Sequence, residues 1–168
     1  MATVTKVIKP SRLKQPAMRA ALLAGMDKVG KKILADFEKT TATWDHKVKF
    51  EVLADLSGPG PYVIVDTDDE IYGYVNNGTR PHLIFPKKPV GRLAFPSGYH
   101  DKTTPGVIGS HAGGSFGPTV FRPYVEHPGT EARNFDAIIA KIWGPRFKRE
   151  MEPIMANVAR ASGHSIGG

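Results

Sequence analysis

A helical pattern of apolar residues dominates the first quarter of the chain. Apolar side chains recur there at steps of four and three, at Met18, Leu22, Met26, Val29, Ile33 and Phe37. Charged residues occupy most of the other faces, and Pro16 suits the first turn of a helix. We therefore predict a long amphipathic helix over residues 14–39 with its apolar stripe in the core. Residues 1–13 are expected to form a flexible or docking arm.

An alternating pattern replaces the helical one after residue 46. Residues 47–52 alternate charged and apolar side chains, which is typical of a strand with one wet face and one buried face. Residues 62–65 are apolar on both faces, which indicates a more central strand. Residues 71–75 alternate again and are rich in aromatic and β-branched side chains. The three segments predict an antiparallel meander laid on the first helix, with residues 67–70 as a solvated hairpin tip.

Two glycine-containing turns stand out in the sequence. Asn77-Gly78 is expected to end the third strand, because both residues tolerate positive φ. A second turn is expected at residues 126–130, where His127 is interpreted as a hydrogen-bonding residue that fixes the turn and not as a general base. We predict that Gly78 and Gly129 are backbone requirements, where any side chain costs about 1 kcal/mol or more.

Prolines and glycines shape the region between these turns. Pro81 and Pro86 bracket residues 82–85, which should be extended and lie at an edge or across a neighbouring subunit. Residues 93–95 and 119–125 are further strand candidates. Between them, residues 96–118 contain six glycines and only scattered apolar side chains. This composition predicts a long extended loop that becomes ordered on assembly.

The last apolar pattern is helical again. Asn134 is a candidate N-cap, and an apolar face follows it at Phe135, Ile138, Ile139 and Ile142. Gly144-Pro145 is expected to interrupt the helix, and Pro153 to bend it. We predict an interrupted C-terminal helix over residues 132–162, followed by a frayed glycine-rich end.

Together these elements predict a single α+β domain over residues 1–168. An antiparallel β-sheet at residues 46–125 packs against a long N-terminal helix and a C-terminal helix, with the long extended loop at residues 96–118. A chain of 168 residues can bury one real core. No segment approaches the roughly 18 apolar residues needed to span a bilayer, and the start of the chain lacks the apolar core of a signal peptide. We expect a soluble protein that is made and used without export.

The charge of the chain is basic and uneven. The net charge is +7, with the excess of Lys and Arg near the two ends and an acidic segment at residues 66–70. Such a balance can indicate nucleic-acid binding. The plainer interpretation is solvated helix faces, because the charges interleave with apolar residues at helical spacing.

Candidate chemistry is sparse. There is no Cys, no Gly-x-Ser-x-Gly elbow and no closely spaced His pair, and the six His residues are scattered. Residues 109–114 do not match a phosphate-binding loop, and residues 66–70 lack the glycine and distal Glu of a calcium loop. A magnesium-dependent nuclease using Asp66, Asp68 and Glu70 is the one enzymatic alternative. We predict no catalytic residues, no metal and no cofactor.

Two motifs stand in a recognisable order. Tyr74-Val-Asn-Asn-Gly-Thr-Arg-Pro81 lies in the middle of the chain, and Val125-Glu-His-Pro-Gly-Thr130 followed by Ala132-Arg-Asn-Phe135 lies near the end. With the long helix before them, these motifs resemble the family of small tail-completion and head-tail joining proteins of long-tailed phages and prophages. The resemblance covers roughly residues 15–160. Where that family commonly has an acidic residue before the Gly-Thr turn, this chain has Asn76 and Asn77.

The resemblance implies a structural virion protein of the tail-completion or tail-terminator type. Such a protein forms a homo-oligomeric ring at the head-tail neck, assembled in the host cytoplasm, and a hexamer is favoured over a twelvefold ring. Its expected partners are neighbouring neck proteins and the tail tube protein, with transient passage of DNA and no membrane. The alternative is a DNA-binding neck or packaging accessory protein.

Two sets of residues carry this expectation. The turns that hold the structure are assigned to Gly78, Thr79, His127, Pro128, Gly129 and Thr130. The subunit interface is assigned to Tyr72, Tyr74, Arg80, Phe85, Tyr99 and Phe116.

Overall fold

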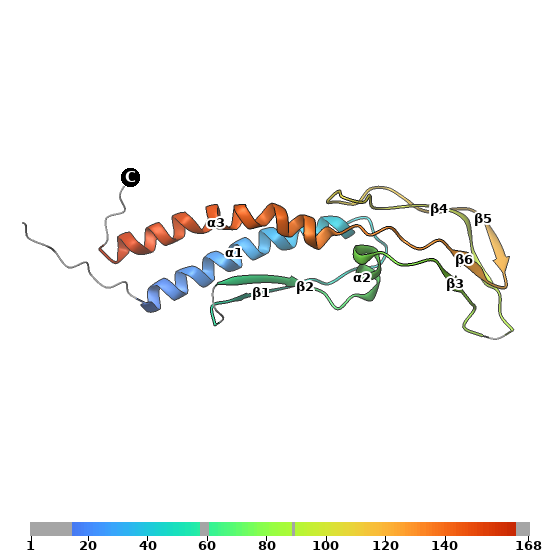
Figure 1. Cartoon of the computed structure of the whole chain (residues 1–168), viewed down its shortest axis with the longest axis horizontal. Coiled ribbons are helices and arrows are strands. Elements are labelled where there is room, and N and C mark those ends of the chain that lie inside the picture. Colours follow the sequence, from blue (N-terminus) through green and yellow to red (C-terminus); the bar gives the residue numbers. More distant parts are fainter. Residues whose placement is uncertain (1–14, 58–60, 89, 164–168) are drawn as a thin grey trace, which may run out of the picture.

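The protein is long and narrow, with a helical body at one end and paired strands projecting from the other (Figure 1). The computed structural model describes residues 15–57, 61–88 and 90–163, so the predicted arm and the glycine-rich end after residue 163 lie outside the described residues. The elements, in order, are α1 Gln15–Thr41, β1 Glu51–Asp55, β2 Tyr62–Asp66, α2 Glu70–Asn77, β3 His82–Ile84, β4 Leu93–His100, β5 Gly114–Arg122, β6 Val125–His127 and α3 Phe135–Ala161. The predicted α+β class is confirmed, with both long helices in the expected places.

The predicted stripe on α1 is the centre of the core. Met26 and Val29 are 0% and 1% exposed, and Phe37 is also buried. This face packs along α3, and Gly25 makes room for Ile154, since a Cβ there would lie 2.3 Å from Cδ1 of that residue. Burying each such apolar side chain contributes roughly 1.5–3 kcal/mol, so the helix pair supplies much of the stability of the body.

The C-terminal helix is continuous, so the predicted interruption at Gly144-Pro145 is wrong. α3 runs through both Pro145 and Pro153. A proline inside a helix costs about 3 kcal/mol. Several buried side chains on the face toward α1 offset this cost: Phe135, Ile139, Trp143, Met151 and Val158. In addition, Nε1 of Trp143 donates to Oδ2 of Asp36 on α1 at 2.8 Å, which ties the middle of α3 to its neighbour.

The first two predicted strands form a hairpin on α1. β1 and β2 are antiparallel, with Leu53 opposite Ile64. The side chains of residues 48, 50 and 52 alternate inward as predicted, although the strand itself begins at Glu51. The prediction that β2 is central is wrong, because within residues 15–57, 61–88 and 90–163 its one strand partner is β1, and Ile64 is 46% exposed. The predicted three-stranded meander is therefore a two-stranded hairpin.

The predicted third strand is a helix. Residues 70–77 form α2, and the segment before it is a helix cap instead of a hairpin tip. Oδ1 of Asp69 accepts a hydrogen bond from the backbone amide of Tyr72 at 2.8 Å, and Glu70 lies in the first turn, where the helix dipole favours a negative charge. Tyr72 and Asn76, one turn apart, are both buried. Helical spacing thus buries Tyr72 and exposes Tyr74, two side chains that alternation would have placed on the same face.

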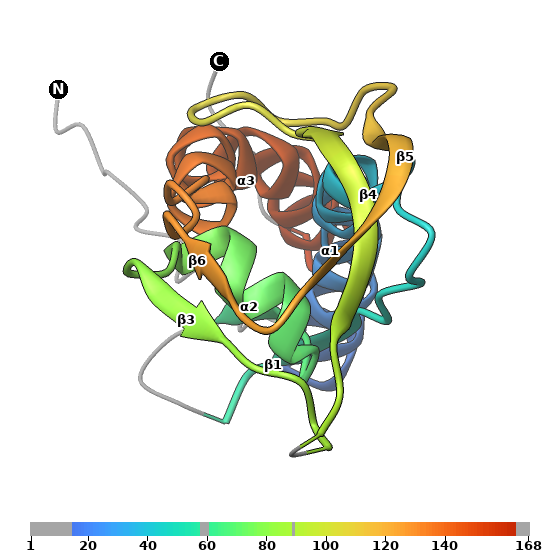
Figure 2. The same ribbon diagram turned by 90° about the vertical axis from the view of Figure 1, so that its right-hand side faces the viewer.

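The rest of the predicted sheet consists of two separate two-stranded ribbons. β3 pairs with β6, and β4 pairs with β5, both antiparallel. Figure 2 looks onto these ribbons and shows them splayed apart in front of the helices. The extended segment predicted at residues 82–85 is found as β3 at residues 82–84, and β6 is its one strand neighbour in the part of the chain that the structure describes.

The predicted loop over residues 96–118 is too long, because strands β4 and β5 occupy both of its ends and leave residues 101–113 between them. Gly98 serves the strand pairing, because a Cβ there would lie 2.3 Å from Cζ of Phe116. The Phe116 ring stacks on His100, with 4.5 Å between the ring centroids. The remaining turn is bonded to the end of α1, since Oγ of Ser110 donates to the carbonyl of Lys39 at 3.1 Å. The span is therefore paired at its ends and bonded to α1 within one subunit, which removes the reason for expecting order only on assembly.

Candidate functional site

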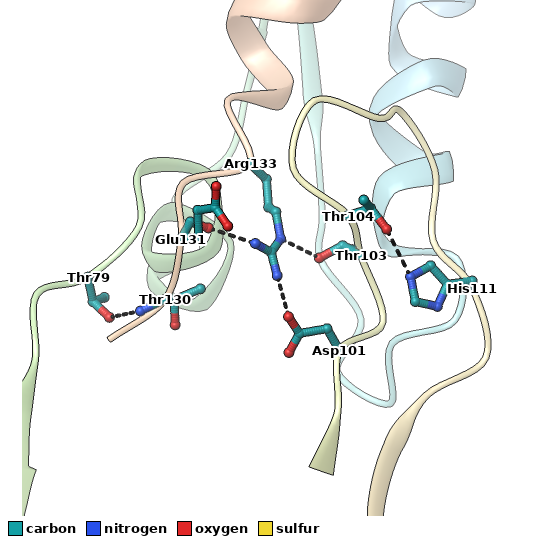
Figure 3. A network of polar contacts seen from close by, with 8 residues as sticks. All are labelled: Thr79, Asp101, Thr103, Thr104, His111, Thr130, Glu131 and Arg133. Carbon is teal, nitrogen blue, oxygen red and sulfur yellow. Dashed lines mark hydrogen bonds and ion pairs between the residues drawn. The ribbon is translucent and has the colours of Figure 1, made fainter. Parts of the chain in front are cut away.

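The two sequence motifs meet at one place, between the helical body and the ribbons. The backbone amide of Thr79 donates to the carbonyl of Thr130 at 2.9 Å, and the amide of Thr130 donates back to the carbonyl of Thr79 at 3.1 Å. The amide of Thr130 also lies 3.0 Å from Oγ1 of Thr79, a contact between residues 51 positions apart in sequence (Figure 3). We call the two Gly-Thr pairs, Gly78-Thr79 and Gly129-Thr130, the Gly-Thr clasp.

Both glycines of the clasp have the backbone conformation that the sequence predicted. Gly78 has φ 73° and Gly129 has φ 89°. A Cβ on Gly129 would lie 2.2 Å from the carbonyl oxygen of Thr79, and a Cβ on Gly78 would lie 2.6 Å from that of Thr130. Each glycine therefore leaves room for the backbone of the opposite turn, so the two motifs depend on each other.

His127 has the role expected of it. Its Nδ1 accepts a hydrogen bond from the amide of Gly129 at 3.0 Å, which fixes the turn. A ring nitrogen that accepts carries no proton, so any proton of this imidazole is on Nε2. The ring also lies against its cross-strand partner His82, at 5.0 Å between ring centroids. His127 thus joins the base of the β3–β6 ribbon to the clasp.

The chain after the clasp runs along the end of α2. The amide of Arg133 donates to the carbonyl of Val75, and the amide of Asn134 to that of Asn76. These bonds use carbonyls that the last turn of a helix leaves without partners. Oδ1 of Asn76 also accepts from the amide of Asp136 at 3.3 Å. Asn134 occupies the N-cap position of α3 as predicted, but it has φ 53° and its side chain makes no cap bond, so Asn76 caps α3 in its place.

Arg133 is the residue that sequence reasoning missed. Its side chain is 4% exposed and is held by three acceptors (Figure 3). Nη2 lies 2.7 Å from Oδ2 of Asp101, Nε donates to Oγ1 of Thr103 at 3.1 Å, and Nη1 donates to the carbonyl of Glu131 at 3.0 Å. Asp101 and Thr103 directly follow β4, so this cation fixes the base of the β4–β5 ribbon to the start of α3. The sequence did contain a signal for this role, because Arg133 belongs to the second motif and lies just before the C-terminal helix.

An open cleft of about 730 Å³ lies beside the clasp and Arg133. Its wall includes His46, whose Nε2 is paired with Oδ2 of Asp69 outside the cleft lining. Burial acts to raise the pKa of Asp69, but the hydrogen bonds from His46 and the amide of Tyr72 outweigh it and leave the pKa lowered. Asp69 therefore caps α2 as an anion. Among the described residues, no three His, Asp or Glu side chains gather where they could hold a metal ion.

Five of the six residues assigned to the subunit interface are exposed, and the sixth is buried. Tyr74, Phe85 and Tyr99 are 57%, 62% and 62% exposed, and Arg80 and Phe116 are also exposed. Tyr72 is 5% exposed, inside an aromatic cluster with Phe37, Trp44, Phe50 and Phe135, so its assignment to the interface is wrong. Its position on a buried helical face, one turn before Asn76, explains the error.

The chain matches no protein-family model, no curated protein and no solved structure. Within the residues that the structure describes, no helix is both long and apolar enough to cross a membrane.

Tyr72 supplies a prediction on stability. Its hydroxyl is buried and has no hydrogen-bond partner of ordinary geometry among the described residues. Burial raises its pKa to about 12, an effect that the nearby Thr40 hydroxyl only partly opposes. Because a buried hydroxyl without a partner is unfavourable, we expect Tyr72→Phe to leave the free energy of unfolding unchanged or raise it by up to about 1 kcal/mol in urea denaturation.

Tyr62→Phe is the matched control for this change. The Tyr62 hydroxyl donates to Oδ2 of Asp55 at 2.8 Å at the surface, so its removal should lower the free energy of unfolding only slightly. A loss above about 1 kcal/mol for Tyr72→Phe would show that the buried hydroxyl is bonded after all.

Proposed function

We propose that this chain is a structural virion protein of the tail-completion or tail-terminator type. It forms a homo-oligomeric ring at the phage head-tail junction, joins the tail to the head and lets DNA pass. The proposal starts from the two motifs of the resemblance. It is supported by the finding that these motifs, far apart in sequence, meet in one clasp at the root of both ribbons.

The observation that carries the proposal is the exposure of large apolar side chains on the projecting ribbons. Phe85 and Tyr99 are each 62% exposed, and Phe121 is 56% exposed. Among the described residues each ribbon has two strands, so every strand has one edge without a paired neighbour there. Isolated two-stranded ribbons are marginally stable and their open edges favour pairing with other chains. Such arms suit a protein whose ribbons are covered by neighbouring subunits.

The clasp and Arg133 support the same function mechanically. The clasp joins the start of β3 to the end of β6, and Arg133 joins the end of β4 to the start of α3. Both ribbons are therefore held at the helical body by bonds between distant parts of the chain. A ring subunit needs arms with a fixed direction, because a heterologous interface closes only at a defined rotation.

Deleting the gene from the phage or prophage that encodes the chain tests the proposal. We expect filled heads and separate tails, or tails of irregular length, in negative-stain images of the particles. Supplying the wild-type chain from a plasmid should restore joined virions and is the control. Normal joined virions without the chain would disprove a role in the neck.

The second candidate is a DNA-binding neck or packaging accessory protein. It is favoured by one observation: the ribbon segments at residues 80–88, 90–100 and 114–125 contain five Lys or Arg residues and no Asp or Glu. Direct phosphate binding would make the affinity for duplex DNA fall steeply with salt, with a slope set by the number of phosphates contacted. Weak retention without such a slope is expected of a ring through which DNA merely passes.

A further inference from the structure

The outer face of the β1–β2 hairpin is uncovered in the subunit. The inner side chains of the hairpin pack on the core, while the outer ones form three cross-strand pairs. We call these outer residues the acceptor face: Glu51 and Asp66, Leu53 and Ile64, Asp55 and Tyr62. Leu53 and Ile64 are 55% and 46% exposed, so two apolar side chains lie together in solvent between carboxylates.

The acceptor face is acidic. Residues 51–70 contain six Asp or Glu and no Lys or Arg. Glu51 and Asp66 stand directly opposite each other, an arrangement of like charges that destabilises a strand pair. The nearest cations before β1 are Lys47 and Lys49, and Nζ of Lys47 donates to the carbonyl of Trp44. A cationic partner would relieve the repulsion and cover the apolar pair.

Asp55 keeps its charge over the whole physiological range. The hydroxyl of Ser57, then that of Tyr62, hold its pKa at about 2. The acidic character of the face therefore does not depend on neutral pH.

The projecting ribbons have the opposite character. We call the segments at residues 80–88, 90–100 and 114–125 the β-arm; its cations are Arg80, Lys87, Lys88, Arg92 and Arg122. Exposed apolar side chains lie among them, including Val90 at 99%, Phe121 at 56% and Tyr124 at 47%. The β-arm points away from the helical body, at the end of the molecule remote from β1 and β2 (Figure 1). Its cations therefore cannot cover the acceptor face of the same subunit.

We propose that the β-arm of one copy seats on the acceptor face of the next copy, with its Lys and Arg side chains against Glu51, Asp55 and Asp66 and its apolar side chains against Leu53 and Ile64. The proposal rests on the proposed function only in taking the partner to be a second copy of this chain. The two surfaces differ, so the contact is head-to-tail and extends into a ring where the rotation closes.

The match of two surfaces within one sequence favours a second copy over DNA. Phosphates would account for the cations of the β-arm. They would leave the acidic acceptor face and the exposed apolar residues of both surfaces without a partner. A second copy satisfies the charges and covers the apolar residues on both sides.

Charge reversal tests the proposal and includes its own rescue. The acceptor variant is Glu51→Lys with Asp66→Lys, and the arm variant is Lys87→Glu with Lys88→Glu, all at exposed positions. Sedimentation velocity should show that each variant alone, folded by circular dichroism, self-associates at least tenfold more weakly than wild type. An equal mixture should associate again, because each variant then meets the opposite charge on the other. Reversal of Glu38 and Glu152, which are exposed on the helices, should change nothing.

The outcomes separate the proposal from its rivals. Unaltered association of both variants, no rescue on mixing, or a wild-type chain that stays monomeric would each overturn it. Loss of salt-dependent binding to a DNA duplex by the arm variant, with association unchanged, would assign the β-arm to DNA and overturn it as well.

Cross-linking locates the contact independently. The chain has no Cys, so Ile64→Cys can carry a photo-activated cross-linker as the single reactive thiol. In assembled protein we expect cross-links to peptides containing Phe121–Tyr124, and none to them from Glu152→Cys. Cross-links from Ile64→Cys to other surfaces alone would overturn the inferred contact while leaving the ring intact. Normal virions after gene deletion would instead reject the proposed function while leaving this contact measurable.

Discussion

Gly129→Ala is expected to be among the most destabilising single substitutions in this protein. A side chain at φ 89° is strained by roughly 1–2 kcal/mol, and its Cβ would lie 2.2 Å from the carbonyl oxygen of Thr79. Because that oxygen is backbone, the clasp must open to make room. We expect the free energy of unfolding to fall by roughly 3–5 kcal/mol, and the melting temperature by on the order of 10 °C in calorimetry.

Two other glycines separate strain from crowding. Gly106 has φ 76° and a Cβ there would meet nothing within 4 Å, so Gly106→Ala should cost only about 1 kcal/mol. Gly73 lies inside α2 with open space beside it, so Gly73→Ala should be neutral or stabilise by up to about 1 kcal/mol. Equal effects of Gly129→Ala and Gly106→Ala would mean that the clasp does not hold the subunit together.

The second large effect is expected at the ion pair of Arg133, and it should be asymmetric. Arg133 is 4% exposed whereas Asp101 is 63% exposed. Asp101→Asn leaves a buried cation with only neutral acceptors, which should cost roughly 1–3 kcal/mol. Arg133→Met leaves Asp101 in water but removes three hydrogen bonds, so a similar loss of roughly 2–3 kcal/mol is expected in urea denaturation.

The double variant and a surface pair complete this test. With both Asp101→Asn and Arg133→Met, no buried charge remains, so the loss should be at least about 1 kcal/mol smaller than the sum of the single losses. Asp27→Asn breaks an exposed pair with Lys31 and should change stability by less than about 0.5 kcal/mol. Additive losses at residues 101 and 133 would show that the two side chains do not act together.

The long helices could be predicted from the sequence because each of them buries one face and exposes the others. The stripe on α1 and the apolar face of α3 face each other over many turns, so the pattern repeats often enough to be unambiguous. The continuity of α3 through Pro145 could not be predicted, since the burial that offsets the proline comes from α1. Local sequence rules give the free-energy cost of a proline inside a helix. The packing that offsets this cost comes from another part of the chain.

The short helix shows how a brief pattern misleads. Residues 71–75 fit a strand by alternation, but Tyr72 and Asn76 also fit one face of a helix. Five residues cannot decide between the two periods. The cap at Asp69 was the local signal for a helix, and it was interpreted as a hairpin tip. The deciding factor, an aromatic cluster drawn from four other segments, is not visible in the sequence.

Only part of the candidate site could be predicted, because some of its features are local in sequence and others depend on distant residues. The turn residues 78–79 and 127–130 could be chosen from their conformational demands, which are local. Their contact with each other was not foreseen, and neither were Arg133 and Asn76, whose partners lie 32 and 60 positions away. The glycines of β4 and β5 were taken as a sign of looseness, although Gly98 serves to seat the ring of Phe116.

The clasp also bears on how this fold can change over time. The chain leaves the helical body at Thr79 and returns at Thr130, and these two residues are hydrogen-bonded neighbours. The segment between them is topologically an insertion, with its entry and exit fixed at the same point. Ribbons of other lengths or sequences can therefore be exchanged between those two residues, provided that the contacts of Asp101 with Arg133 and of Ser110 with the end of α1 are kept. Lineages that share this body are expected to vary most in that inserted segment, each adapting it to a different neighbour.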